Sequence, residues 1–391
     1  MRLAITSEFR LIEHEWRAFE KRADYTPFQS FDWLLTWQRC IGSRAGVKPA
    51  IVTGHQSNRE LLFVLPLAIE RTLFGRRCVF FGYDVCDYNA PLLAPEFPAV
   101  IRPPDFANWW RVIQKFMLRK PEFNYDVLFL EKMPERIGTQ ENPMLALATI
   151  LRPARAYRAN LGDDWESFYA SKRSSATRSR DRTKRRRLGE SGELRITTLQ
   201  DPEERQTALR ILFSQKGRFF ARIKEPNMFE QPKYSDFYLS VAAAAGPLIH
   251  ISRLDVGRTC VAINLGLQFR GCYYYVLASY DDGALSRFGP GAMHLRELMR
   301  YAISQRFKHF DFTIGEHPYK LEWADEEAKL YDHIAATSWS GVPGAAAITL
   351  KRDARRMLRK YPLLWQLTVQ LKPLVGSLRS LIGRTKPLLR W

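Results

Sequence analysis

The stretch "GPGAMHLRELMRYAISQRF", residues 289–307, lies between two strand-like regions and decides how the C-terminal half of the chain is interpreted. Its apolar residues recur at the spacing of a helix that begins just after a glycine-proline-glycine loop. Before it, residues 247–281 contain three apolar segments separated by turns at Asp255–Gly257 and Arg270–Gly271, which is typical of a β-meander. After it, residues 309–314, "HFDFTI", resemble a further strand. This order predicts a mixed α/β unit.

The N-terminal half has a similar order of elements, although no repeat of individual residues is visible. Residues 2–6 predict a strand, residues 8–23 an amphipathic helix, and residues 125–134, "YDVLFLEKMP", a buried strand. We therefore expect an α/β (α+β) chain whose two halves each contain a mixed, mostly antiparallel sheet flanked by helices. The predicted boundaries are residues 1–155, 156–345 and a basic amphipathic tail, 346–391.

Composition limits the class of protein and its partners. A chain of 391 residues is long enough for two domains, and its net charge of +19 predicts attraction to polyanions such as nucleic acid, anionic lipid or phosphorylated small molecules. The five cysteines are widely spaced and no pair has CxxC spacing. The histidines also lack the spacing of metal ligands, so we expect reduced thiols and no metal site.

The last forty residues differ from the rest of the chain. Residues 351–391 contain eleven Lys or Arg against a single acid, Asp353, mixed with leucines and tryptophans. Such a segment could lie on an anionic membrane surface, or it could pack on the body with its charges solvated. Because no apolar run reaches the length of a membrane span, we expect a cytoplasmic protein, with peripheral contact at the inner face of the membrane as the alternative.

The loop before the helix is a candidate anion site. Glycines allow close backbone approach, and the first turn of a helix leaves N–H groups free to bind a phosphate or pyrophosphate. A plain turn is the alternative. The residues that we expect to hold such a ligand are Gly289, Pro290 and Gly291, with Arg287 beside them.

The strand over residues 309–314 ends in a polar loop. Asp311 or Glu316 could accept a proton from an attacking nucleophile, whereas Tyr319 and Lys320 could stabilise a developing negative charge. Each of these residues could instead have only a structural role, but their clustering at a strand end favours function. No GxSxG motif occurs, so an acyl-serine intermediate is not suggested.

The run "SKRSSATRSRDRTKRRRL", residues 171–188, is the most basic part of the chain. We expect one helix in which Lys172, Arg173 and Arg180 line a wall for an anionic substrate, with a solvated face as the alternative. Few aromatic residues are interleaved, so nucleic acid is an unlikely main partner. A loop over residues 84–89, "DVCDYN", could present Asp87 and Tyr88 to an acceptor, or could be a turn stabilised by Asx hydrogen bonds.

Four stretches together resemble the CelD/BcsL-type acyltransferases of the GNAT superfamily, a family linked to bacterial cellulose biosynthesis. They are "TPFQSFDWLLTW" (26–37), "SKRSSATRSRDRTKRRRLGESG" (171–192), "SRFGPGAMHL" (286–295) and "DFTIGEHPYKLEW" (311–323). The resemblance implies tandem GNAT-like domains, similar to those of Fem-type transferases. It also implies acetyl-CoA or another acyl-CoA as donor, bound by the C-terminal domain. The donor-binding residues that the resemblance implies are Arg287, Phe288, Gly289, Pro290, Gly291, Ala292 and His294.

The resemblance leads to a first hypothesis and two alternatives. The first is direct acyl transfer from a CoA thioester to an amine or hydroxyl of a sugar, a lipid-linked glycan precursor or an amino compound. The second keeps the fold but uses aminoacyl-tRNA, as Fem-type transferases do. The third is a non-catalytic accessory of a polysaccharide synthase at the membrane surface.

Overall fold

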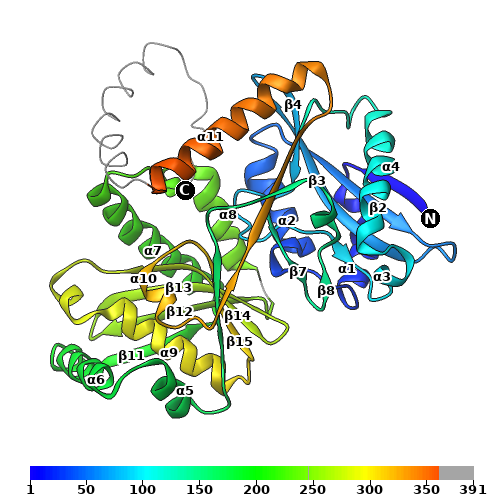
Figure 1. Cartoon of the computed structure of the whole chain (residues 1–391). Coiled ribbons are helices and arrows are strands. Elements are labelled where there is room, and N and C mark those ends of the chain that lie inside the picture. The colour runs from blue at the N-terminus through cyan, green and yellow to red at the C-terminus, as the bar shows by residue number, and fades with distance from the viewer. Residues whose placement is uncertain (245, 361–391) are drawn as a thin grey trace, which may run out of the picture.

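The chain forms two mixed β-sheets flanked by helices (Figure 1). A computed structural model describes residues 1–244 and 246–360. The first sheet has the order β1-β2-β3-β4-β6-β17-β9, with β5 paired to β3, and the second has the order β11-β12-β13-β14-β15-β10-β16. The predicted fold class, two mostly antiparallel sheets with helices around them, is therefore confirmed.

The strands of the first sheet are β1 (Arg2–Thr6), β2 (Lys48–His55), β3 (Leu61–Thr72), β4 (Gly75–Phe80), β5 (Leu92–Leu93), β6 (Val127–Pro134), β9 (Thr149–Leu151) and β17 (Leu330–Ala336). Those of the second are β10 (Ala156–Asn160), β11 (Leu194–Leu199), β12 (Ile249–Val256), β13 (Thr259–Phe269), β14 (Cys272–Tyr280), β15 (His309–Ile314) and β16 (Glu326–Ala328). A hairpin joins β7 (Arg136–Ile137) and β8 (Gln140–Glu141). The α-helices are α1 (Phe9–Glu20), α2 (Phe31–Trp37), α3 (Phe97–Val100), α4 (Phe106–Leu118), α5 (Trp165–Lys172), α6 (Ser175–Glu190), α7 (Pro202–Ile223), α8 (Pro232–Ala243), α9 (Pro290–Ser304), α10 (Pro318–Leu321) and α11 (Val342–Lys360).

The two sheets have the same topology. In each, four antiparallel strands lead to one parallel pair, which is β4 with β6 in the first sheet and β14 with β15 in the second. A helix precedes the second strand of each parallel pair, α4 in the first half and α9 in the second. The similar order of elements seen in the sequence thus extends to the order and direction of the strands.

The first sheet also contains one strand from the far end of the chain. The segment between β9 and β10 crosses from the first sheet to the second, and the residue between β16 and β17 returns the chain to the first sheet. β17 lies between β6 and β9, and β10 lies between β15 and β16. The last strand of the C-terminal half therefore completes the N-terminal sheet.

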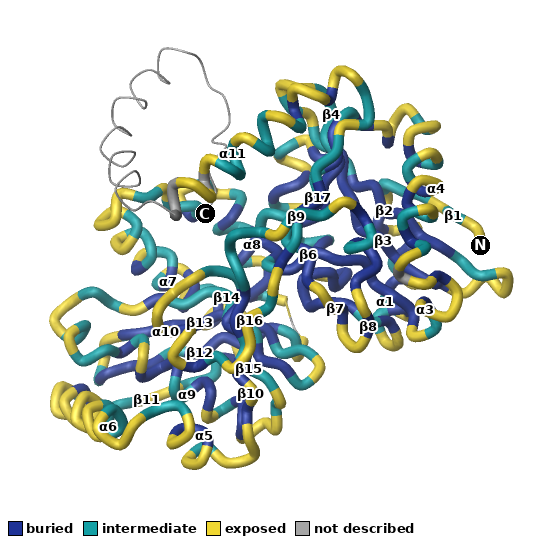
Figure 2. The backbone as a smooth tube through the Cα atoms, in the orientation of Figure 1, coloured by how far each residue is buried: buried dark blue, intermediate teal, exposed yellow. Residues whose placement is uncertain are grey.

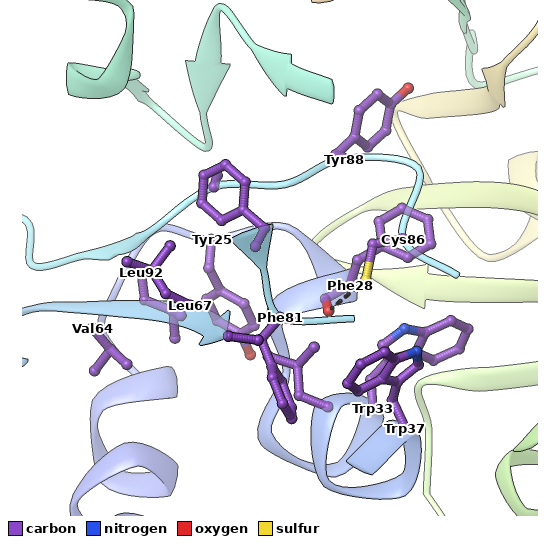
Figure 3. Packing of buried hydrophobic residues seen from close by; sticks show 14 of the residues in the cluster. Tyr25, Phe28, Trp33, Trp37, Val64, Leu67, Phe81, Cys86, Tyr88 and Leu92 are labelled. Carbon is purple, nitrogen blue, oxygen red and sulfur yellow. Dashed lines mark hydrogen bonds between the residues drawn. The ribbon is translucent and has the colours of Figure 1, made fainter. Parts of the chain in front are cut away.

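One hydrophobic core joins the halves. The side chain of Trp33 on α2 meets Phe237 on α8 edge to face, with ring centroids 5.1 Å apart. Figure 3 shows Trp33 and Trp37 packed near the loop that carries Cys86, whose thiol approaches the Phe28 carbonyl. Buried residues of both halves belong to this single cluster. The interface is thus apolar in its centre, as in a permanent contact.

The basic run differs from its prediction because it forms two helices rather than one. α5 ends at Lys172, and α6 begins after Ser174, whose hydroxyl accepts the backbone N–H of Thr177 at 3.2 Å. A serine that caps a new helix interrupts the old one, because its extended backbone cannot continue the α5 ladder. Figure 2 shows α6 exposed along most of its length.

Candidate active site where two parallel strands diverge

The parallel strands β14 and β15 are paired over only three residues. Cys272–Tyr274 face His309–Asp311, although β14 continues to Tyr280 and β15 to Ile314. Since both strands run in the same direction, their unpaired carboxyl ends lie at one edge of the sheet. The backbone there is strained, because the β-branched residue Thr313 has a φ of 57°. Strain of this kind is concentrated at functional sites.

The N-terminus of α9 follows the free end of β14. Gly289 caps the helix at a φ of 66° without a side-chain hydrogen bond, and Pro290 occupies the first helical position. The N–H groups of Gly291 and Ala292 lie in the first turn, where no helical carbonyl can accept from them. A Cβ on Gly291 would come 3.1 Å from the Tyr280 ring, so glycine is needed for the close approach of helix and strand. The helix start is therefore open to an anion.

The remaining predicted donor residues divide into two groups. Arg287 is exposed, with its guanidinium over the Phe288 ring at 4.8 Å, and it has no acidic partner within residues 1–244 and 246–360. His294, in contrast, is buried under α9, where Nε2 lies 2.8 Å from Ser252 Oγ. Burial, assisted by nearby His250, lowers the pKa of His294 to about 3. The structure thus places His294 in the core and the other six residues around the helix start.

Asp311 lies on the face of the second sheet that meets the N-terminal half. Its Oδ1 accepts the Tyr88 hydroxyl at 2.7 Å and the Thr313 backbone N–H at 2.7 Å, and Oδ2 lies 3.5 Å from Arg158 Nη2. Burial raises the pKa of Asp311, although Arg158 and the two hydrogen bonds oppose the rise. Two residues predicted from separate stretches, Tyr88 and Asp311, are therefore in direct contact.

Lys320 is buried behind the strained strand end. Its Nζ donates to the carbonyls of Thr313 at 3.3 Å and Ile314 at 3.0 Å. Burial lowers the pKa of Lys320 to about 8, with Asp87 and Asp311 opposing the shift. Burial also raises the pKa of Asp87, against the effects of Lys132, a hydrogen bond with Thr313 and Lys320. Asp87, Asp311 and Lys320 thus belong to one electrostatically coupled cluster.

Glu316 and Tyr319 lie at the exposed side of this cluster. Tyr319 stacks on His317 with ring centroids 5.8 Å apart, and burial of its hydroxyl raises the pKa of Tyr319 to about 12. Glu316 is exposed and has no hydrogen bond or ion pair among the residues that the structure describes. The pKa of Tyr157 on β10 is raised mainly by burial and, to a smaller extent, by the charge of Glu316.

The basic residues singled out in the sequence have separate surroundings. Lys172 forms an ion pair with Asp325, and Arg173 pairs with Glu322 at 2.5 Å while its guanidinium lies 4.5 Å from the Trp323 ring. These contacts fasten α5 to the segment after α10. Arg180 is exposed on α6, and among the described residues its one side-chain hydrogen bond is to the Thr177 hydroxyl, at 3.4 Å. Of the three, Arg180 is therefore the one most available to a ligand.

Two residues of the site were not singled out from the sequence. Arg158 on β10 reaches Asp311, and its buried Nε has no hydrogen-bond partner within the described part of the chain. Lys132 donates to the carbonyls of Tyr83 at 2.8 Å and Cys86 at 2.9 Å, and so holds the loop that presents Tyr88. A single Arg or Lys within a strand gives no indication, in the sequence, that it belongs to a site. The antiparallel pairing of β10 with β15 brings Arg158 beside Asp311.

Within residues 1–244 and 246–360, no three His, Cys, Asp or Glu side chains lie close enough together to hold a metal ion. Within the same ranges, no helix combines the length and apolar character needed to cross a bilayer.

The fold occurs in several solved structures. FemX superposes with a TM-score of 0.57 at 9% identity, over 86% of this chain and 98% of that one. A conserved protein of unknown function from Bacteroides thetaiotaomicron gives 0.52 at 13% identity, over 86% and 100%. L-PGS from Bacillus licheniformis gives 0.50 at 12% identity, over 87% and 95%. At such identities the likeness concerns the fold alone.

Sequence comparison covers a smaller part of the chain. No curated protein of similar sequence matches it. Residues 175–321 match the family model described as an acetyltransferase (GNAT) domain. This region begins at α6 and ends with α10, so it includes the α9 start and the divergent strand pair. The C-terminal half thus carries a region that matches the GNAT acetyltransferase domain, within a two-sheet fold similar to that of FemX.

Proposed function

We propose that this chain transfers an acyl group from an acyl-CoA, such as acetyl-CoA, to an amine or hydroxyl of an acceptor. The observation that carries the proposal is the divergence of β14 and β15 next to the open N-terminus of α9. A helix start binds the pyrophosphate of a donor, and unpaired strand backbone can bind an extended ligand by hydrogen bonds. In the first half β4 and β6 are also paired over only three residues, but Asp105 precedes α4 and would repel an anion.

The donor would approach along the sheet edge. Its pyrophosphate would rest on the N–H groups of Gly291 and Ala292, with Arg287 as the nearby cation. The remainder of the donor would follow the diverging strands, so that the thioester reaches Thr313. Backbone N–H groups there would hold the carbonyl oxygen as it becomes negative.

The acceptor would approach from the side of the N-terminal half, where Asp87, Tyr88 and Asp311 lie. Its nitrogen or oxygen would attack the thioester carbon and form a tetrahedral intermediate. The C–S bond would then break and CoA would leave as the thiolate. The proton lost by the acceptor would pass to Asp311, directly or through water, and finally to the thiolate.

Asp311 is a better supported base than Glu316. Burial raises the pKa of Asp311, which makes its carboxylate a stronger base, whereas Glu316 is exposed at the rim. Lys320 would act mainly by holding the Thr313 and Ile314 carbonyls, and its charge would also stabilise the intermediate. Tyr319, near the rim, would donate a hydrogen bond to the leaving thiolate before the thiolate takes up the proton from Asp311.

The acceptor class rests on the family resemblance. A link with bacterial cellulose synthesis makes a sugar, a glycan precursor or another cell-envelope amine or alcohol the proposed acceptor. The half-buried cation Arg158 and the buried cation Lys320 would form charge-assisted hydrogen bonds with electron-rich oxygen atoms of the acceptor or the intermediate.

A second candidate is transfer from aminoacyl-tRNA. Two observations favour it, namely the FemX-like fold and the exposed cations of α6, among them Arg180, Arg182 and Lys184. This function predicts RNA binding that weakens steeply as salt concentration rises.

Thermal unfolding with acetyl-CoA, longer acyl-CoAs or tRNA separates the two candidates. Acyl-CoA should raise the melting temperature of the wild type, and Gly291→Asp should abolish the rise because its carboxylate repels the pyrophosphate. Gly162→Asp is the matched control, since Gly162 is exposed and no atom lies near its Cβ position. Stabilisation by tRNA with no response to any acyl-CoA would contradict the first candidate and support the second.

A further inference from the structure

An apolar strip is exposed at the end of the first sheet where α11 begins. Trp339, just before α11, is 94% exposed, and Leu73 in the turn between β3 and β4 is 79% exposed. On α11 itself, Val342, Leu350 and Met357 are also exposed and share one side of the helix, since spacings of eight and seven residues place them within about 80° around its axis. We use the name apolar strip for Leu73, Phe74, Trp339, Val342, Leu350 and Met357.

The two parts of the apolar strip are in contact. A Cβ on Gly344 would lie 3.0 Å from the Phe74 Cβ, so the first turn of α11 packs directly on the β3–β4 turn. Figure 1 shows α11 running along the outside of the molecule from the end of the first sheet. Its 19 residues correspond to about 28 Å of helix. The apolar strip is therefore a long, narrow surface rather than a scatter of single side chains.

Trp339 is held in its exposed position. The hydroxyls of Ser338 and Ser340, on either side of it, donate to Asp126 Oδ1 at 2.8 Å and 2.7 Å. Ser338 Oγ also accepts the Gly341 N–H at 3.1 Å, which caps the turn. The Arg76 backbone N–H, together with the Ser340 and Ser338 hydroxyls, lowers the pKa of Asp126. The fixed turn thus keeps a large indole exposed to water. This exposure is unfavourable in free energy unless the indole is buried against a binding partner or a membrane.

The surroundings of the apolar strip are basic. Arg71 is exposed at the end of β3, and α11 contains six Lys or Arg, among them the exposed Arg356, against one acid, Asp353. The sequence beyond the helix, residues 361–391, adds five Lys or Arg and no acid. A second copy of this chain, with the same net charge of +19, would be repelled from such a surface. An anionic bilayer would be attracted to it.

We propose that the apolar strip docks on the surface of an anionic lipid bilayer, with Trp339 and Leu73 entering the headgroup region. An indole suits this depth because its ring is apolar and its N–H can remain hydrated. Flanking arginines would bind lipid phosphates while α11 lies parallel to the membrane. The protein would then rest on the bilayer without crossing it. This inference is independent of the transferase proposal.

Vesicle flotation tests the inference with the full chain. Wild type should float with vesicles of phosphatidylcholine and phosphatidylglycerol at low salt, and far less with phosphatidylcholine alone. The double variant Trp339→Ser/Leu73→Ser should lose about tenfold in partitioning, because two large apolar side chains no longer leave water. Leu11→Ser is the matched control: Leu11 is 78% exposed on α1, outside the strip, and its loss should change nothing.

Three outcomes would overturn the inference. One is a wild type that does not float with anionic vesicles. Another is a double variant that floats as well as wild type, which would assign binding to residues 361–391 or another surface. The third is an apolar strip that joins two copies, seen as a lipid-free dimer by light scattering that the double variant abolishes.

A spectroscopic measurement covers the case in which the double variant does not fold. Lipids brominated near the headgroups should quench part of the tryptophan fluorescence of wild type. Trp339→Phe keeps an apolar ring but removes this indole, so it should lose that quenching while still floating. Equal quenching in both proteins would contradict insertion of Trp339.

Discussion

The Tyr88 hydroxyl donates to Asp311 Oδ1 at 2.7 Å, although the two residues are 223 positions apart in the chain. Tyr88 comes from the loop after β4 of the first sheet, and Asp311 from β15 of the second. Both are buried. The candidate base is therefore oriented by the opposite half of the protein, which makes the N-terminal half part of the site.

Tyr88→Phe tests this arrangement through pH dependence. The Tyr88 hydrogen bond lowers the pKa of Asp311, so its removal should raise that pKa further above the ordinary value. The acidic limb of kcat/KM should move to higher pH, and activity at neutral pH should fall by roughly 10-fold or more, as expected for a hydrogen bond to a charged group. Tyr331→Phe, which removes a tyrosine–carboxylate bond to Glu135 at the surface, should leave the profile unchanged. An unshifted limb in Tyr88→Phe would show that Asp311 is not the titrating base.

Gly291→Ala tests the fit between α9 and β14. The added methyl would lie 3.1 Å from Tyr280 Cδ1, so the helix start or the ring must shift by a few tenths of an ångström. We expect the Kd for acetyl-CoA to rise by roughly 10-fold, equivalent to about 1.4 kcal/mol. Because the crowding atom belongs to a side chain, Gly291→Ala/Tyr280→Ala should recover most of the affinity in calorimetry. Failure of the double variant to recover would place the effect in the backbone instead.

Lys320→Met tests the buried ammonium. The pKa of Lys320 is about 8 in the folded protein, below the value of 10.5 for an exposed lysine. Between these two pH values the unfolded chain binds more protons than the folded one, so stability rises with pH across this window. The gain in unfolding free energy from pH 8 to pH 10 should be larger in wild type than in Lys320→Met, by on the order of 2 kcal/mol. Equal gains would mean that Lys320 titrates normally.

Arg173 and Arg180 should separate stability from ligand binding. Arg173→Met removes the ion pair with Glu322 and the contact with the Trp323 ring, so the melting temperature should fall, by an amount equivalent to about 1 kcal/mol. Arg180→Met should leave stability unchanged, because among the described residues the one side-chain hydrogen bond of Arg180 is to a hydroxyl of its own helix. If α6 binds an anionic donor, Arg180→Met alone should weaken that binding. The reverse pattern would contradict the contacts described here.

Local signals in the sequence were sufficient for much of the fold. The meander and the helix after Gly289 follow from periodicity and turn chemistry. The break at Arg173–Ser174 did not, because a serine inside a basic run resembles any other polar residue of a solvated helix. Ser174 becomes a cap only because Arg173 turns back to Trp323.

The candidate site was predicted in pieces. Chemistry-bearing residue types at a strand end identified Asp311 and Lys320, but their partners depend on contacts across the whole chain. Nothing in the sequence near Arg158 indicates that β10 pairs with β15 and brings its guanidinium to Asp311. The positive φ of Thr313 could not be predicted from the sequence either, because threonine is common in ordinary strands.

The placement of β17 in the first sheet has a consequence for how the molecule can be divided. A fragment ending at residue 155 would lack β17, which lies between β6 and β9. The backbone N–H and C=O groups along the edges of β6 and β9 would then be unpaired. The complementary fragment would carry β17 with no sheet to receive it. Neither half can therefore keep its structure when the chain is cut at residue 155. We expect either fragment, expressed alone, to aggregate.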